Sequence, residues 1–311
     1  DVIQPEKIEF KQNSYEDGEN SIISFPEFLL LVLDVCTGGE QPASHYQPDK
    51  LIEKFDALKT YFTAGEFYEK MLYYRLLLDY YTIRRDIKDG QGNYSLILKG
   101  PKDDSDKLKQ YQSMLYVSTE AFYNWLKPYL RKLEQDELHS CAEMLAFLKK
   151  GDNERHSILP ARKDLSYKAS GNIRYWFWRL DYYLWEQRST FFNEEEQKIV
   201  EHYVFRRNRS IEHLHPQDES HNEEWEEEAV HSFGNLAMIS QSFNSQQSND
   251  HIQIKFARIH EQISNKSLQS IKMFLMCKLA DFNYQNWTMK LAKEHENEMI
   301  EFLERSFYIS D

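Results

Sequence analysis

The residues best suited to do chemistry lie in one stretch, 206–255. There an acidic residue precedes a histidine at Glu212-His213, an asparagine follows a glycine at Asn235, and a second amide follows at Asn244. Hydrolysis of a phosphodiester needs a base to deprotonate water and a cation to neutralise charge on the phosphate and leaving oxygen. This order of residues predicts a strand–strand–helix metal site for that reaction.

Each of these residues has an expected role. His213 is the expected general base, because an unperturbed imidazole pKa of about 6.5 suits neutral pH. Glu212 is the expected metal ligand, and the two reach one site only at a strand end, because adjacent strand residues point to opposite faces. Asn235 is expected to orient the imidazole or its loop. Asn244 would offer an amide oxygen, and oxygen ligands favour Mg²⁺ or Mn²⁺ over zinc.

Basic side chains near these residues are candidates for holding substrate phosphates: Arg206, Arg207, Arg209 and Lys255. The whole chain has a net charge of −13, which argues against a protein that coats nucleic acid through bulk electrostatics. The segment 251–293 nevertheless has more basic than acidic residues. A local basic face is therefore compatible with phosphate binding.

Other interpretations remain open. A Glu-His pair often occurs by chance, an asparagine after a glycine is most often a turn residue, and an arginine-rich stretch is often a solvated strand edge. His213, His215 and His231 are alternative ligands of a structural zinc ion. A rival from another functional class is a non-catalytic helical interaction or regulatory module with a vestigial nuclease site. The joint order and spacing of the motifs favour the nuclease.

The elements that position these residues are predicted to be mainly α-helical. The chain has 311 residues with only 10 Gly and 8 Pro, which favours long helices. We expect a helical body over 1–170 and, over 171–311, a nuclease domain with flanking helices around a small ββα-metal core. Between these helices, the stretch 197–214 loses the helical period and predicts two extended segments.

An aromatic helix is expected over 172–186. Its aromatic residues cover most of its circumference, which is typical of a buried helix. Trp176, Trp178 and Trp185 are therefore expected in the core rather than as platforms for stacked bases.

The three cysteines, Cys36, Cys141 and Cys277, form no C-x-x-C pair. They predict buried thiols in a reducing cytoplasm rather than a zinc ribbon or a disulfide framework. The longest apolar run, 28–35, is too short to span a bilayer. We therefore expect a cytoplasmic protein without a membrane partner. A first residue other than Met also suggests a fragment.

The motifs RNRSIEHLHPQ, Trp225, HSFGNLAMIS, Asn244, SND and Lys255 together resemble the C-terminal HNH-type nuclease domain of GmrSD-like type IV restriction proteins. Upstream, FPEFLLLVLDV, YYRLLLDYYTIRR and SMLYVSTEAFYNWL resemble the middle helical region of that family. The resemblance covers most of the chain, and its motifs are specific over 210–255.

This resemblance implies a metal-dependent DNA endonuclease of a bacterial defence system that acts on foreign, possibly modified, DNA. His213 matches the general base of the family, Glu212 the paired acidic ligand, Asn235 the middle asparagine and Asn244 the last, metal-side position. The N-terminal nucleotide-binding module of the family, marked by D-G-Q-Q-R, is not found, because the similar stretch 89–92 lacks the arginine and predicts a turn. Such a module is an expected partner outside this chain.

Overall fold

The computed structural model describes residues 18–87, 94–102, 105–118, 120–207, 209–217, 225–240 and 252–308. This described part is mainly helical, as the sequence predicted. The chain forms two compact units, Asp1–Ser105 and Asp106–Asp311. The expected limits at 170/171 concern family domains and stay a prediction. The turn predicted at 89–92 lies outside the described residues.

The first unit combines helices with a three-stranded antiparallel sheet of order β1-β2-β3. Its elements are β1 (Gly18–Ser21), α1 (Phe25–Cys36), η1 (Ala43–His45), η2 (Pro48–Lys50), α2 (Leu51–Leu58), α3 (Ala64–Tyr81), β2 (Ile83–Ile87) and β3 (Tyr94–Leu98). Helix α1 begins with a capping box in which Ser24 and Glu27 bond each other's backbone N–H groups. Helices α1 and α3 pack together.

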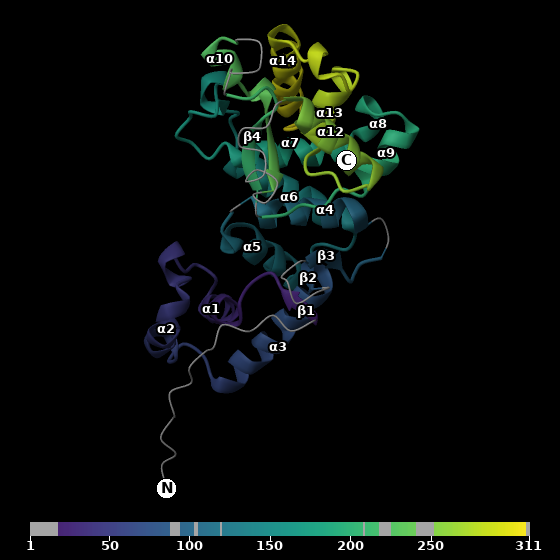
Figure 1. The fold of residues 1–311 in the computed structure, drawn as a ribbon. Coiled ribbons are helices and arrows are strands. Elements are labelled where there is room, and N and C mark those ends of the chain that lie inside the picture. The colour runs from purple at the N-terminus through teal and green to yellow at the C-terminus, as the bar shows by residue number, and fades with distance from the viewer. Residues whose placement is uncertain are drawn as a thin grey trace. The chain divides into compact units, whose positions relative to one another are not determined.

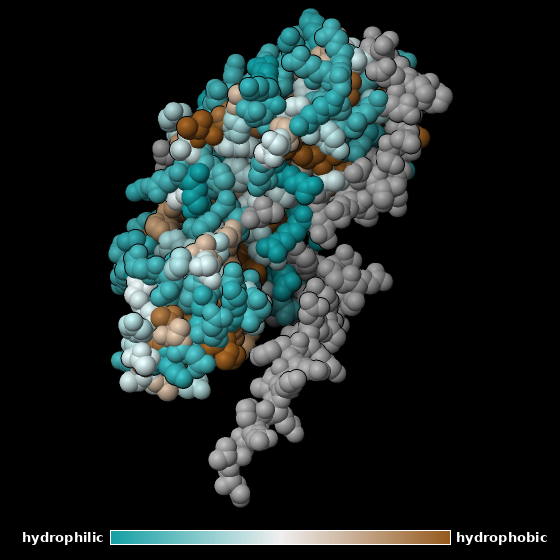
Figure 2. All heavy atoms as spheres, turned by 90° about the vertical axis from the view of Figure 1, so that its left-hand side faces the viewer, coloured by the Kyte–Doolittle hydropathy of each residue, from teal (hydrophilic) through white to brown (hydrophobic). Residues whose placement is uncertain are grey.

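The surface of the molecule is largely hydrophilic on the face drawn in Figure 2, where hydrophobic side chains form separate patches. Exposed apolar side chains of the first unit include Ile52 on α2, and Leu72 and Leu76 on α3. Within the described ranges, no helix is long and apolar enough to cross a membrane.

The second unit consists of helices around a two-stranded antiparallel hairpin, β4-β5 (Figure 1). Its elements are α4 (Ser105–Val117), α5 (Phe122–Glu134), α6 (Cys141–Arg155), η3 (Arg162–Leu165), α7 (Arg174–Glu186), α8 (Arg188–Phe191), α9 (Glu194–Glu201), β4 (Arg209–His213), α10 (Glu227–Val230), η4 (Phe233–Asn235), β5 (Leu236–Ser240), α12 (Ile252–Ser264), α13 (Ile271–Leu279), η5 (Tyr284–Asn286) and α14 (Met289–Arg305).

Helix α7 lies at the centre of this unit. Its residues from Tyr175 to Trp185 are all buried, and it packs against α8, α13, α14 and β5. Trp176, Trp178 and Trp185 are 5%, 1% and 3% exposed, so the prediction that they belong to the core is confirmed. Aromatic side chains on every side of the helix give it this central place.

The segment before β4 differs from the prediction. Extended backbone was expected from Gln197, yet α9 continues to Glu201. The reason is local, because Asn193 accepts hydrogen bonds from the N–H groups of Glu195 and Glu196 and so starts a helix. Only the second extended stretch forms a strand, β4.

The hairpin is anchored to the helices around it. Strands β4 and β5 pair from Arg209↔Ser240 to His213↔Leu236. Strand β5 packs on α7 and α13, and α14 packs on η4. Helix α12 follows the hairpin in the chain and packs on α13. The three cysteines are free thiols.

Candidate functional site

The chain leaves β4 at His213, and Asn235 holds the turn that follows. The Asn235 side chain is fully buried. Its Oδ1 accepts from the backbone N–H of His215 at 2.8 Å and from the indole N–H of Trp287 at 3.2 Å. Its Nδ2 donates to the carbonyl oxygens of His215 at 3.0 Å and Val230 at 2.9 Å. The amide is thus fully engaged in fastening the loop after β4 to the end of α10.

The residue before Asn235 must be a glycine. A Cβ built on Gly234 would lie 2.1 Å from the carbonyl oxygen of Ala292 on α14. Real atoms do not approach so closely, so any side chain would push α14 away from η4. The Gly-Asn pair therefore combines a close helix approach with a loop clamp.

A buried lysine that the sequence analysis did not single out supports the same turn. Lys272 of α13 donates from Nζ to the carbonyl oxygens of Phe233 at 2.8 Å, Gly234 at 3.4 Å and Leu236 at 2.7 Å. Burial lowers the pKa of Lys272 to about 7, against the opposing charges of Asp181 and Glu296. A lysine inside the apolar run IKMFLMCKL is the signal that could have found it.

His213 lies among aromatic and polar side chains and is only 4% exposed. Its Nε2 lies 3.0 Å from Nδ1 of His231, and its Nδ1 lies 3.0 Å from Nε2 of Gln217. The ring of Tyr167 lies 4.5 Å from the His213 ring, centroid to centroid. Two of these neighbours, Tyr167 and Gln217, were not predicted.

The surroundings of His213 keep it neutral. Burial lowers its pKa to about 3, and the electrostatic effects of His231, Lys255 and His215 act in the same direction. Burial also lowers the pKa of His231, and Lys168 adds to the effect while Glu227 opposes it. At neutral pH both imidazoles are therefore uncharged.

Glu212 faces different neighbours from those of His213. Lys255 of α12 donates from Nζ to Glu212 Oε1 at 2.5 Å and to the carbonyl oxygen of His213 at 2.6 Å. The Lys255 side chain is 3% exposed, so it ties α12 to the end of β4 rather than facing solvent. The two side chains of Glu212 and His213 thus take opposite sides of β4, as alternation along a strand requires.

Of the remaining predicted residues, the structure describes Arg206 and Arg207 in full. Arg207 is exposed, donates from Nε to the carbonyl oxygen of Tyr116 at 3.1 Å and lies over that ring, and Arg206 is half-buried. The side chain of Arg209 and the whole of Asn244 lie outside the described part. Of the two expected metal ligands, only Glu212 therefore lies in the described part, and the fit of a metal ion is judged on Glu212 alone.

Two observations bear on a metal ion. In the described ranges, no three His, Cys, Asp or Glu side chains lie close enough together to hold one. His215, the third residue of the zinc alternative, stacks on Trp225 with ring centroids 4.1 Å apart. The donor that fits a hard cation is the Glu212 carboxylate, whose ion pair with Lys255 a metal would have to share.

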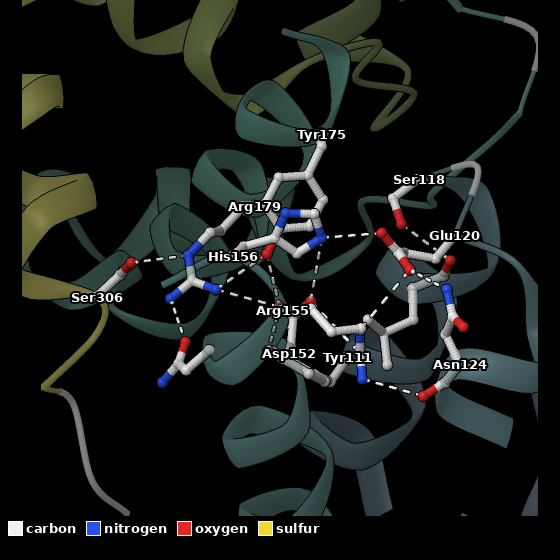
Figure 3. Close-up of polar contacts among 12 residues, drawn as sticks. Tyr111, Ser118, Glu120, Asn124, Asp152, Arg155, His156, Tyr175, Arg179 and Ser306 are labelled. Carbon is white, nitrogen blue, oxygen red and sulfur yellow. Dashed lines mark hydrogen bonds and ion pairs between the residues drawn. The ribbon is translucent and has the colours of Figure 1, made fainter. Parts of the chain in front are cut away.

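A second buried polar cluster lies between α4, α6, α7 and the end of α14 (Figure 3). Asp152 Oδ2 accepts hydrogen bonds from the hydroxyls of Tyr111 at 2.8 Å and Tyr175 at 2.7 Å, and from Arg179 at 3.1 Å. Arg179 also donates from Nε to the hydroxyl of Ser306 at 3.0 Å. No motif in the sequence pointed to this cluster.

Half-buried charged and polar residues border this cluster. His156 Nε2 lies 2.9 Å from Glu120 Oε1, and the His156 ring stacks on Tyr175 with centroids 3.7 Å apart. The hydrogen bond from His156 is the largest of the effects that lower the pKa of Glu120. Arg155 lies 3.7 Å from both Glu120 and Asp152. Acidic and basic groups alternate here, which suits a scaffold.

Comparison with known proteins places the hairpin in a known domain family. Residues 152–302 match the family model of GmrSD restriction endonucleases, C-terminal domain. No curated protein and no solved structure matches the chain. The matched range contains the hairpin, α12 and nearly all of α14, so the resemblance to GmrSD-like proteins is confirmed for this part of the chain.

Proposed function

We propose that the protein is a divalent-metal-dependent DNA endonuclease of a restriction system, because residues 152–302 match the C-terminal domain of GmrSD restriction endonucleases. The observation that carries the proposal is the neutral, buried His213 at the end of β4, inside the matched range. A general base must be unprotonated at the working pH. A pKa of about 3 meets that condition, although it also makes the ring a weak base until substrate changes its surroundings.

The machinery divides into a reacting group and its supports. In the proposed reaction His213 takes a proton from the water that attacks the phosphodiester. Asn235, through its four hydrogen bonds, fixes the loop at His215 and Val230 and so positions the end of β4. We therefore assign Asn235 a positioning role. Lys272 supports the same turn from the other side.

The metal would be Mg²⁺ or Mn²⁺, with Glu212 and Asn244 as ligands in an HNH-type site. When bound, it would neutralise charge on the phosphate and the leaving oxygen. Lys255 lies against Glu212 and is buried, so we leave phosphate binding to the exposed Arg207 and the half-buried Arg206. A nucleotide-binding partner module, target choice by base modification and a cytoplasmic location belong to the same proposal.

A second candidate is a non-catalytic module with a vestigial site. The observation that favours it is the closure of the site, because both ring nitrogens of His213 are engaged and Glu212 is ion-paired with Lys255. In that case the hairpin would serve only to join α7, α12 and α13. Activity separates the two candidates.

The test is cleavage of plasmid DNAs with different base modifications, with and without Mg²⁺, Mn²⁺ and nucleotide. Where the wild type cuts, His213→Ala should lower the rate at least about 100-fold and leave DNA binding nearly unchanged. The matched control is His139→Ala, since His139 is an exposed histidine in the same unit. Equal cutting by His213→Ala and the wild type would refute the role of His213.

A further inference from the structure

The contacts of His213 fix which of its nitrogens can act. A neutral imidazole has one N–H group and one lone pair. Gln217 presents its amide nitrogen, a donor, to Nδ1 of His213 at 3.0 Å, so Nδ1 accepts. The hydrogen then sits on Nε2, which donates to Nδ1 of His231 at 3.0 Å.

We propose that His231 is a positioning residue for the general base. By accepting the Nε2–H of His213 on the side opposite Gln217, it holds that ring in one rotamer. Once the Gln217 amide has moved aside, His231 keeps the hydrogen on Nε2 and leaves Nδ1 as the nitrogen that takes the proton of water. The water would occupy the place where the amide of Gln217 now lies. This proposal deepens the proposed nuclease function and rests on it.

The surroundings of His231 are built to keep it in place. The backbone N–H of Tyr167 donates to the carbonyl oxygen of His231 at 3.0 Å. The two rings stack, with centroids 5.7 Å apart and an interplanar angle of 15°. Tyr167 also contacts the ring of His213. His231 is thus held through its backbone and through its ring.

The two sides of His213 differ in how easily they open. The His231 side is packed against Tyr167, whereas Gln217 is an exposed residue that contacts His213 through its side-chain amide. Rotation of the Gln217 side chain would uncover Nδ1 without disturbing the hairpin. This asymmetry makes Nδ1, rather than Nε2, the working nitrogen.

Two variants of His231 separate the hydrogen bond from the packing. His231→Phe keeps an aromatic ring to stack on Tyr167 but removes the acceptor. His231→Asn removes the ring but places an amide oxygen near the position of Nδ1. With the full chain and plasmid DNA, His231→Phe should lower kcat at least about tenfold with KM unchanged, because an imidazole in the wrong tautomer is a poor base.

Under the same conditions, His231→Asn should restore most of the kcat lost in His231→Phe. A residue needed only for packing would give the reverse order, with the Phe variant active and the Asn variant impaired. Either that reverse order or an unchanged kcat in His231→Phe would overturn the proposal.

A second readout does not depend on cleavage. Long-range ¹H–¹⁵N spectra of ¹⁵N-histidine-labelled protein report which ring nitrogen carries the hydrogen, and His213→Ala identifies the signals of His213. Because the Gln217 amide also favours Nε2–H, the spectra are recorded in a Gln217→Ala background. We expect Nε2–H in Gln217→Ala alone and with His231→Asn, and a mixture of tautomers with His231→Phe. An Nδ1–H tautomer in Gln217→Ala alone would overturn the proposal. If the wild type cuts no DNA, the nuclease function fails, while these spectra still decide the role of His231.

Discussion

Two buried polar clusters of the second unit differ in what surrounds their charged groups. Around Asp152, the carboxylate meets Arg179 and two tyrosine hydroxyls, so opposite charges and donors satisfy each other. Around His213, burial is the main cause of the lowered pKa, and His231, Lys255 and His215 all act in the same direction. The first arrangement stabilises charges where they are, whereas the second keeps an imidazole uncharged.

This difference separates a scaffold from a site. A buried ion pair contributes little net stability, yet removal of one partner is costly because the other charge stays buried. A neutral histidine bonded to another neutral histidine leaves no such charge behind. Substitutions in the first cluster should therefore act on stability, and those in the second on activity.

The largest effect is expected for Arg179→Met. Asp152 would remain buried without its guanidinium partner, so the free energy of unfolding should fall by about 3–5 kcal/mol in urea denaturation. Arg179→Met combined with Asp152→Asn should recover part of the loss. Arg174→Met is the matched control, because Arg174 is exposed on the same helix. A loss no larger than that of the control would show that the two clusters do not differ as described.

A smaller effect is expected for Lys272→Met. The variant keeps the length of the side chain but leaves the carbonyl oxygens of Phe233 and Leu236 without this donor. Stability should fall by about 1–3 kcal/mol in the same measurement. Because these carbonyls flank Asn235, cleavage of DNA should fall as well. Unchanged stability together with unchanged cleavage would remove Lys272 from the support of the site.

The sequence singled out His213, the proposed general base, because it lies in a motif with fixed spacing. Its supports were harder to foresee. Lys272 reaches the turn from α13, and Tyr167 comes from a loop before α7, so both meet the hairpin only after the chain has folded. The aromatic pattern of α7 did predict its burial, because periodicity within one helix is a local property.

The contacts of Glu212 and Lys255 show a different limit. Residue type suggested a metal ligand and a phosphate-binding lysine, and the structure joins the two in one ion pair across 43 residues of the chain. Sequence spacing cannot show such a partner, because it depends on where α12 packs. Asn235 was expected to orient the imidazole or its loop, and its four bonds go to the loop at His215, to Val230 at the end of α10 and to Trp287.

The smallest effect on stability is expected for His295, a buried histidine on α14. It is 1% exposed, and among the described residues neither ring nitrogen has a hydrogen-bond partner. Burial, with the nearby charge of Lys272, lowers its pKa well below the ordinary value. Below a pH of about 6.5, His295 therefore binds a proton in the unfolded chain but not in the folded protein. Stability must fall as the pH drops below about 6.5.

His295→Leu removes this proton and keeps the position apolar. Between pH 7.5 and pH 5.5 the wild type should lose about 1.4 kcal/mol more stability than the variant in urea denaturation, while the two differ less at pH 7.5. Carboxylates titrate equally in both proteins, so the difference isolates His295. Parallel pH profiles would mean that His295 binds the proton in the folded protein as readily as in the unfolded chain, which contradicts the effect of burial on its pKa.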